Sequence, residues 1–368
     1  MANVVLFTAA PNSDGMMGGH QMFTGEKRPP NGLGYLLAVL RQAGHHCEIV
    51  DRYAGDMSWA DDGFESFDLA GIYTCSVCTD DIRWLIDNIK CERIAVGGPH
   101  AALRPEWFAE VRRHSRKDVV VVKGEGEDAI LALLDPCYLD HWKDIGPDIE
   151  PERIINLDSL PVFPWEYFWD EEFRHMYQWS YQHDKTLENV FTMNTTRGCP
   201  YGCEFCVIKE LWGRKITGFS AGRVLDDIEY CRSLGAKAIY FREDNFTVLK
   251  TRLRAICEGL KPDPLPWICE TRADVDLGLL YHMKEAGCKW VYVGVESLSQ
   301  RMLDIYNKRI TVEQVSKFFA ECHALGIKTY ASMIIGHPEE TELDREITFN
   351  RIGRLQPDAA CFNEWRAI

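Results

Sequence analysis

Three cysteines stand close together in the segment NTTRGCPYGCEFCVIKE, residues 194–210. Cys199, Cys203 and Cys206 form a CxxxCxxC run, and thiolates are soft ligands that bind zinc and iron–sulfur clusters. A structural zinc site takes four protein ligands, commonly as two close pairs, and no second pair follows at a suitable distance. Three cysteines fit a [4Fe–4S] cluster with one iron left open to a small molecule, and a degenerate zinc knuckle is the alternative.

The elements around the cysteines alternate between strand and helix patterns. The predicted strands are 190–197, 237–244, 266–272, 290–297, 328–336 and 358–365. Helix patterns at 223–235, 251–260, 277–287, 311–326 and 342–355 fill the gaps. This alternation predicts a partial TIM-type barrel, (βα)6, whose sites lie on the loops after the strands, and the cysteine run follows the first of them.

The segment RGCPYGCEFC, with Phe205 before its last cysteine, resembles the hallmark of the radical S-adenosylmethionine (SAM) enzymes. The resemblance implies that Cys199, Cys203 and Cys206 hold a [4Fe–4S] cluster and that SAM is its fourth ligand. It also implies a reaction in which one electron passes to the sulfonium and a C–S bond breaks homolytically.

Polar residues at the other strand ends match the same family. By this resemblance the cofactor-binding residues are Glu243 and Asp244 after the second strand, Arg272 after the third, Glu296 after the fourth and Gly336 after the fifth. In IIGHPEET, Glu339 replaces the glycine of the family's GxPGET pattern, which puts backbone contacts to adenine in doubt. The alternative for each charged residue is a solvated loop charge.

The N-terminal half has its own alternation of five strands and intervening helices. It predicts a Rossmann-like, doubly wound parallel sheet over residues 1–138, with ligands bound beyond the carboxyl ends of the strands. We expect an aromatic and proline-rich linker at 139–188 and the barrel at 189–368.

This half resembles the cobalamin-binding-type domain that precedes the barrel in a subgroup of radical SAM enzymes. The resemblance is carried by segments such as AVGGPHAAL and VVVKGEGED, and it implies that Gly97, Gly98, Gly124 and Gly126 shape a rim facing cobalamin. The DxHxxG loop that supplies a lower histidine ligand in many cobalamin proteins is absent, and the nearest stretch, DRYAGD, lacks the histidine.

Two features of the N-terminal half are local to this chain. Cys75 and Cys78 in CSVC follow the third strand and could bind substrate or a soft metal or metalloid, or form a redox pair, with simple burial as the alternative. The loop at 11–30, rich in glycine and methionine, is interpreted as a mobile cover or a surface loop.

Charge and composition narrow the function classes. A formal net charge of −15 argues against a nucleic-acid partner, including a transfer RNA. No apolar run is long enough to span a bilayer and no signal peptide is evident, so we expect a cytoplasmic protein with reduced thiols.

The resemblance implies a transferase. The first hypothesis is cobalamin-dependent methylation of a small molecule in natural-product biosynthesis, with an electron donor such as flavodoxin or ferredoxin. The second is cobalamin-independent transfer of a 3-amino-3-carboxypropyl radical to a soft acceptor such as trivalent arsenic, as in arsinothricin-type biosynthesis. A third, from another class, is a non-catalytic iron–sulfur or cobalamin sensor.

Overall fold

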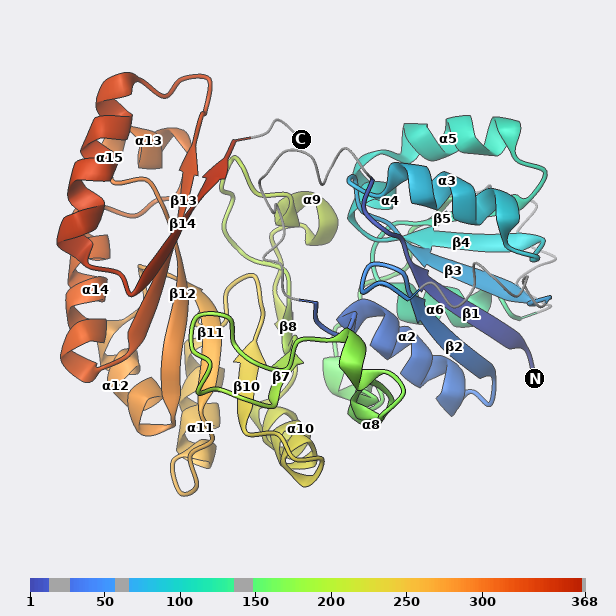
Figure 1. Ribbon diagram of the computed structural model, residues 1–368, viewed down its shortest axis with the longest axis horizontal. Coiled ribbons are helices and arrows are strands. Elements are labelled where there is room, and N and C mark those ends of the chain that lie inside the picture. Colours follow the sequence, from blue (N-terminus) through green and yellow to red (C-terminus); the bar gives the residue numbers. More distant parts are fainter. Residues whose placement is uncertain (13–26, 57–65, 136–147, 366–368) are drawn as a thin grey trace. The chain divides into compact units, whose positions relative to one another are not determined.

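The computed structural model describes residues 1–12, 27–56, 66–135 and 148–365. It divides into two compact units, Met1–Gln178 and Trp179–Ile368, whose helices and strands are labelled in Figure 1. The predicted loop cover at 11–30 falls largely outside the described residues.

The first unit alternates strands with helices. Its elements are β1 (Asn3–Thr8), α2 (Asn31–Gln42), β2 (His46–Asp51), β3 (Leu69–Tyr73), α3 (Thr79–Asn88), β4 (Arg93–Gly97), α4 (Pro99–Leu103), α5 (Pro105–His114), β5 (Asp118–Val122), α6 (Gly126–Ala132), β6 (Asp148–Ile149), η1 (Leu157–Ser159), α8 (Trp165–Trp169) and η2 (Arg174–Met176).

The sheet of this unit is parallel throughout, in the order β2-β1-β3-β4-β5-β6. Its strands are short apolar runs because both faces are covered, by α3 and α5 on one side and by α2 and α6 on the other (Figure 1). The doubly wound sheet is therefore confirmed. The expected count of five strands was wrong, because β6 adds a sixth at the edge.

The described part of the predicted linker is ordered structure rather than plain connection. β6 joins the first sheet, and Phe163 packs on Gly34 of α2, where an added Cβ would lie 2.1 Å from the Phe163 ring. Tyr177 Oη donates to Asp51 at 3.0 Å. These contacts tie residues 148–178 to the first unit.

The second unit repeats the alternation. Its elements are β7 (Val190–Met193), β8 (Thr196–Arg197), α9 (Ile208–Trp212), β9 (Thr217–Gly218), α10 (Ala221–Ser233), β10 (Ala238–Phe241), α11 (Lys250–Leu260), β11 (Trp267–Arg272), α12 (Leu277–Glu285), β12 (Cys288–Glu296), α13 (Gln300–Ile305), α14 (Val312–Leu325), β13 (Lys328–Ile335), α15 (Glu342–Leu355) and β14 (Ala359–Glu364).

Six parallel strands in the order β7-β10-β11-β12-β13-β14 form the second sheet, and the helices α11, α12, α14 and α15 lie along one side of it (Figure 1). Capping boxes at Thr311 and Thr341 start α14 and α15. The strand order follows the chain order, which confirms the partial (βα)6 barrel and brings the carboxyl ends of all six strands to one edge. No helix within the described residues is long and apolar enough to cross a membrane.

Candidate active site

The cysteine run lies in the loop between β8 and β9, directly after the first barrel strand. β8 and β9 pair antiparallel, so both ends of the loop are fixed. Cys203 is buried, Cys199 and Cys206 are half-buried, and all three are free thiols. Burial raises the pKa of Cys206 to about 11, and the neighbouring Cys203 and Cys199 add to the shift. The three thiols are thus close enough to influence one another's ionisation.

The donor set of three cysteines is one ligand short of the four that a structural zinc site takes, and it fits a [4Fe–4S] cluster with one open iron. A [4Fe–4S] cluster binds thiolates on separate irons, so its ligands do not have to converge on one point.

Glu243 anchors the chain just before the cysteines. Its carboxylate accepts hydrogen bonds from the backbone N and the hydroxyl of Thr195 and from the hydroxyl of Thr196, at 2.5 Å for the last. Arg252 of α11 donates hydrogen bonds to the carbonyl and the hydroxyl of Thr195. The buried carboxylate therefore holds the start of the cysteine loop to the chain just after β10.

Asp244, the next residue, faces solvent in part and stands near the backbone of Gly198. Desolvation by the surrounding atoms, followed by the charge of Glu243, raises the pKa of Asp244 to about 6. Of the predicted pair, Asp244 is thus the exposed carboxylate and Glu243 the buried one.

Arg272, at the end of β11, is buried against the cysteine loop. Its guanidinium donates to Cys203 Sγ at 3.5 Å and lies 3.8 Å from the centroid of the Tyr201 ring. Asp274 accepts two of its hydrogen bonds, at 3.0 and 3.1 Å, and the carbonyl of Lys308 accepts another. The planar guanidinium of Arg272 thus connects Cys203 to the segment that follows α13.

Glu296, at the end of β12, forms a buried ion pair with Lys308, with Nζ 2.7 Å from Oε1. Glu296 has a φ of +67°, and Asn307 and Arg309 on either side of Lys308 have φ values of +49° and +56°. Non-glycine residues in the left-handed region are strained and cluster at functional sites. A β-bulge between Gly294 and Glu296 also marks the place.

The segment carrying Lys308 also holds the cysteine loop. Asn307 Nδ2 donates to the carbonyl of Gly202 at 2.8 Å, and Glu204 N donates to the carbonyl of Tyr306 at 3.0 Å. Lys308 was missed by sequence reasoning because it does not stand at a strand end. Its only sequence signal is the polar turn NKR after the short helix α13.

The end of β13 closes the other side of the loop. Gly336 has a φ of +86° and donates its backbone N–H to Glu340 at 2.7 Å. His337 Nε2 lies 3.4 Å from Glu204, and the His337 ring packs on Trp365. The backbone N–H of Glu339 donates to His337 Nδ1 at 3.1 Å. This N–H is therefore engaged within the chain at the position where Glu339 replaces the glycine of the GxPGET pattern.

In the first unit the four glycines predicted to face cobalamin differ in their backbone conformation and in their surroundings. Gly98 (φ +97°) lies where an added Cβ would be 2.9 Å from the carbonyl of Thr74, and Gly126 packs against Leu36 of α2. Gly97 makes only ordinary contacts. Gly124 has a φ of +115° and no described atom within 4 Å of an added Cβ, so it alone of the four borders open space.

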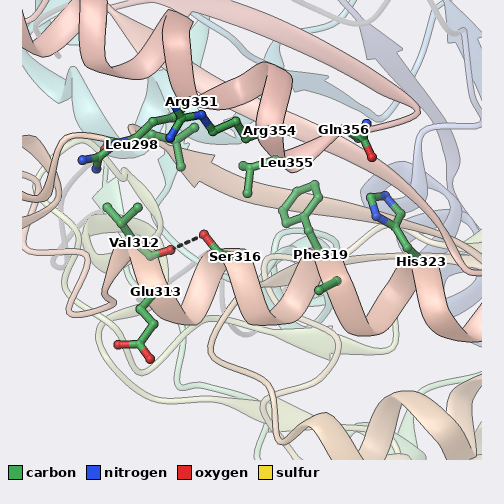
Figure 2. Close-up of a pocket in the computed structure, with 11 residues that line it drawn as sticks. Leu298, Val312, Glu313, Ser316, Phe319, His323, Arg351, Arg354, Leu355 and Gln356 are labelled. Carbon is green, nitrogen blue, oxygen red and sulfur yellow. Dashed lines mark hydrogen bonds between the residues drawn. The ribbon is translucent and has the colours of Figure 1, made fainter.

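Two further features were described by the structure, one in each unit. Cys75 and Cys78 have their sulfurs 3.0 Å apart at the end of β3. In the second unit, Figure 2 shows a cavity between α14 and α15 lined by residues such as Val312, Phe319 and Arg351, none of which was predicted for the site.

Sequence comparisons place the chain among known proteins. The sequence model of the Radical SAM superfamily matches residues 193–352. An uncharacterized methyltransferase of Pyrococcus horikoshii is 30% identical over 362 residues, covering 92% of this chain and 76% of the relative. An anaerobic magnesium-protoporphyrin IX monomethyl ester cyclase of Cereibacter sphaeroides is 24% identical, covering 90% of this chain but only 57% of the relative.

A solved structure shares the whole fold. The radical SAM methyltransferase TsrM of Kitasatospora setae, with cobalamin and a [4Fe–4S] cluster bound, superposes with a TM-score of 0.71 at 16% identity, covering 99% of this chain and 72% of TsrM. At that identity the likeness shows the fold alone. The cysteine loop, the matched family model and the relative from Pyrococcus lead to one conclusion: this chain belongs to the radical SAM superfamily and is a radical SAM enzyme, with a Rossmann-like N-terminal unit.

Proposed function

We propose that the protein is a cobalamin-dependent radical SAM methyltransferase in which Cys199, Cys203 and Cys206 hold the cluster. The observation that carries the proposal is a set of buried charged side chains around the cysteine loop. Glu243, after β10, bonds the chain before the loop, and Arg272 of β11 bonds Cys203. Glu296 of β12 pairs with Lys308, whose neighbour Asn307 bonds Gly202 of the loop. A structural metal knuckle does not need such a set of buried charges at a barrel edge.

The chain's own residues then have separate tasks. Arg272 places a positive charge and an N–H beside the Cys203 thiolate, and Glu243 fixes the backbone that leads into the loop. Asp244 and the Gly336 turn are the groups left to bind SAM, with Glu296 held in place by Lys308. When bound, the cluster supplies the electron for cleavage of SAM.

Methyl transfer is supported by the relatives. The Pyrococcus relative carries the name methyltransferase, and TsrM is a methyltransferase with cobalamin bound. Neither 3-amino-3-carboxypropyl transfer to arsenic nor a sensor role is favoured by these matches. Cobalamin, when bound, supplies a methyl carrier, and we assign it to the carboxyl edge of the first sheet, where Gly124 borders open space.

The absence of a DxHxxG histidine has a structural counterpart. In DRYAGD, Asp51 is buried and bonded to Thr8 and Tyr177, while Arg52 is paired with Asp81 at 2.5 Å. The side chains of Asp51 and Arg52 are therefore engaged in hydrogen bonds and an ion pair within the first unit. We propose that cobalamin binds without a lower ligand from this segment. A small-molecule substrate, a reducing partner such as flavodoxin or ferredoxin, a role in natural-product biosynthesis and a cytoplasmic location stay predictions.

Anaerobic reconstitution with iron and sulfide tests the cluster assignment. We expect the native protein to bind iron and sulfide in equal amounts and to gain visible absorbance, and a variant with Cys199, Cys203 and Cys206 all changed to alanine to gain neither. Cys361→Ala, at a half-buried cysteine of β14, is the control and should reconstitute normally. Equal iron uptake by the triple variant would refute the assignment.

A further inference from the structure

We propose that Cys75 and Cys78 form a reversible dithiol–disulfide site that exchanges with low-molecular-weight disulfides. The two residues form a CxxC pair in the turn from β3 into α3, and their sulfurs already lie in contact at 3.0 Å. Both are free thiols in the structure. The site belongs to the first unit and does not depend on the proposed methyl transfer.

The surroundings hold the pair in place. Cys78 N donates to the carbonyl of Cys75 at 3.1 Å, which closes the turn. Asn12 binds the same turn from the chain after β1, since its N donates to the carbonyl of Val77 at 2.7 Å and its side chain donates to Thr79 at 2.9 Å. Ser76, between the cysteines, bonds His100 at 3.1 Å. The turn is thus fixed on three sides, so the two sulfurs meet without a rearrangement of the backbone.

The two thiols differ in the way that an exchange site requires. Cys75 is half-buried and so reachable by a small molecule, whereas Cys78 is fully buried at the N-cap of α3. The hydrogen bond from Cys78 lowers the pKa of Cys75, and a thiolate is the attacking species in thiol–disulfide exchange. Cys75 is therefore the attacking sulfur and Cys78 the resolving one.

The exchange balances with a small disulfide as the oxidant. The Cys75 thiolate attacks one sulfur of that disulfide, forms a mixed disulfide and releases a small thiol. Cys78 then loses its proton and attacks Cys75, which releases the second small thiol and leaves the Cys75–Cys78 disulfide. Two electrons and two protons pass from the protein to the small disulfide. The pair stands at the carboxyl end of a central strand. Ligands bind beyond that end in such sheets, so a change in the redox state of the pair would change the surface that a ligand meets.

Differential alkylation tests the site in the cluster-loaded protein. The protein is equilibrated anaerobically in mixtures of reduced and oxidised dithiothreitol, quenched with acid, alkylated and mapped by mass spectrometry. We expect the peptide with both cysteines to lose two hydrogens and both alkylation sites as the mixture becomes oxidising, and to regain them on reduction. The buried Cys91 should stay a free thiol throughout.

A variant resolves the order of attack. Cys78→Ser, treated with oxidised glutathione, should trap one glutathione on Cys75, and Cys75→Ser should trap none on Cys78. Alkylation of both native cysteines at every mixture, or disulfides that join either cysteine to others, would overturn the proposal. Iron content in the same samples reports the cluster separately, so the two assignments fail independently.

Discussion

Arg272 is the residue on which the contacts of the cysteine loop converge. It touches Cys203, stacks on Tyr201 and bonds Asp274 and the backbone of Lys308 with the rest of its fork. Its donors are engaged within the chain, and we propose that it holds and polarises Cys203 as a ligand of the cluster. The predicted contact of Arg272 with the cofactor stays a prediction.

Replacing Arg272 by glutamine should make the reduction potential of the reconstituted cluster more negative, because a positive charge and an N–H beside a thiolate favour the reduced cluster. An EPR-monitored redox titration measures the shift. Arg254→Gln, which removes an exposed arginine of α11, is the control and should leave the potential unchanged. A potential equal to that of the native protein at full iron content would contradict this role.

Several of these residues were predictable because parallel strands end at one edge, which places Asp244, Arg272 and Glu296 together from their positions alone. Lys308 was not predictable, because its position depends on the left-handed backbone of Asn307 and Arg309 on either side of it. The partners of Glu243 were also hidden, because threonine hydroxyls carry no periodic signal.

At the scale of elements, the bulge of β12 depends on a glycine. A Cβ on Gly294 would lie 2.5 Å from Glu296 Oε1 and 2.9 Å from Lys308 Nζ, so any larger residue would displace the ion pair from its present position. We expect Gly294→Ala to lower the free energy of unfolding by about 1–3 kcal/mol, as overpacking does, and to weaken SAM binding.

Urea unfolding and SAM-binding titration measure the two effects. Gly353→Ala in α15, where an added Cβ meets nothing, is the control and should be neutral or stabilising by about 0.5–1 kcal/mol. An equal response of both variants would show that the ion pair has no steric need for Gly294.

The start of α15 depends on a buried carboxylate. Asp344 accepts hydrogen bonds from Ser299 at 2.6 Å and from Thr341 at 2.6 Å and pairs with Arg301, and these bonds hold the pKa of Asp344 well below its usual 3.8. A lowered folded-state pKa gives stability that is present above about pH 4 and is lost as the pH falls further.

We therefore expect Asp344→Asn to reduce the free energy of unfolding at pH 7, and the difference from the native protein to shrink below pH 4. Urea unfolding from pH 7 down to pH 3 measures it. Asp304→Asn, at an exposed carboxylate of α13 that bonds Gln300, controls for the loss of one surface charge. A difference that stays constant with pH would contradict the assignment.

The long elements followed from the sequence and the short ones did not. Helices such as α14 have clear apolar periods and capping residues, so their existence was evident. β6 and β9 are two residues each, too short for any period to show, and they were missed. The predicted strand 190–197 is divided in the structure into β7 and the two-residue β8.

At the scale of the whole molecule, the chain combines two α/β units that each offer the carboxyl edge of a parallel sheet. This was predictable because most of the buried parallel strands are apolar runs followed by an amphipathic helix. The placement of residues 148–178 with the first unit was not, because aromatic packing such as that of Phe163 has no sequence period.

The cobalamin assignment is testable at Gly124. Gly124→Ala and Gly44→Ala both place a Cβ at a positive φ with no atom nearby, so each should cost about 1–2 kcal/mol of stability. Only Gly124 lies at the ligand edge of the sheet, so we expect only its variant to bind hydroxocobalamin several-fold more weakly in an absorbance titration. Equal affinities would remove Gly124 from the site.

The central claim is that this chain cleaves SAM reductively and transfers its methyl group. The most direct measurement is mass-spectrometric analysis of the products formed from SAM by the reconstituted protein with cobalamin and a low-potential reductant. The account predicts 5′-deoxyadenosine and S-adenosylhomocysteine from the native protein, and no 5′-deoxyadenosine from the variant without Cys199, Cys203 and Cys206. Formation of 5′-methylthioadenosine in their place, or of neither product, would contradict it.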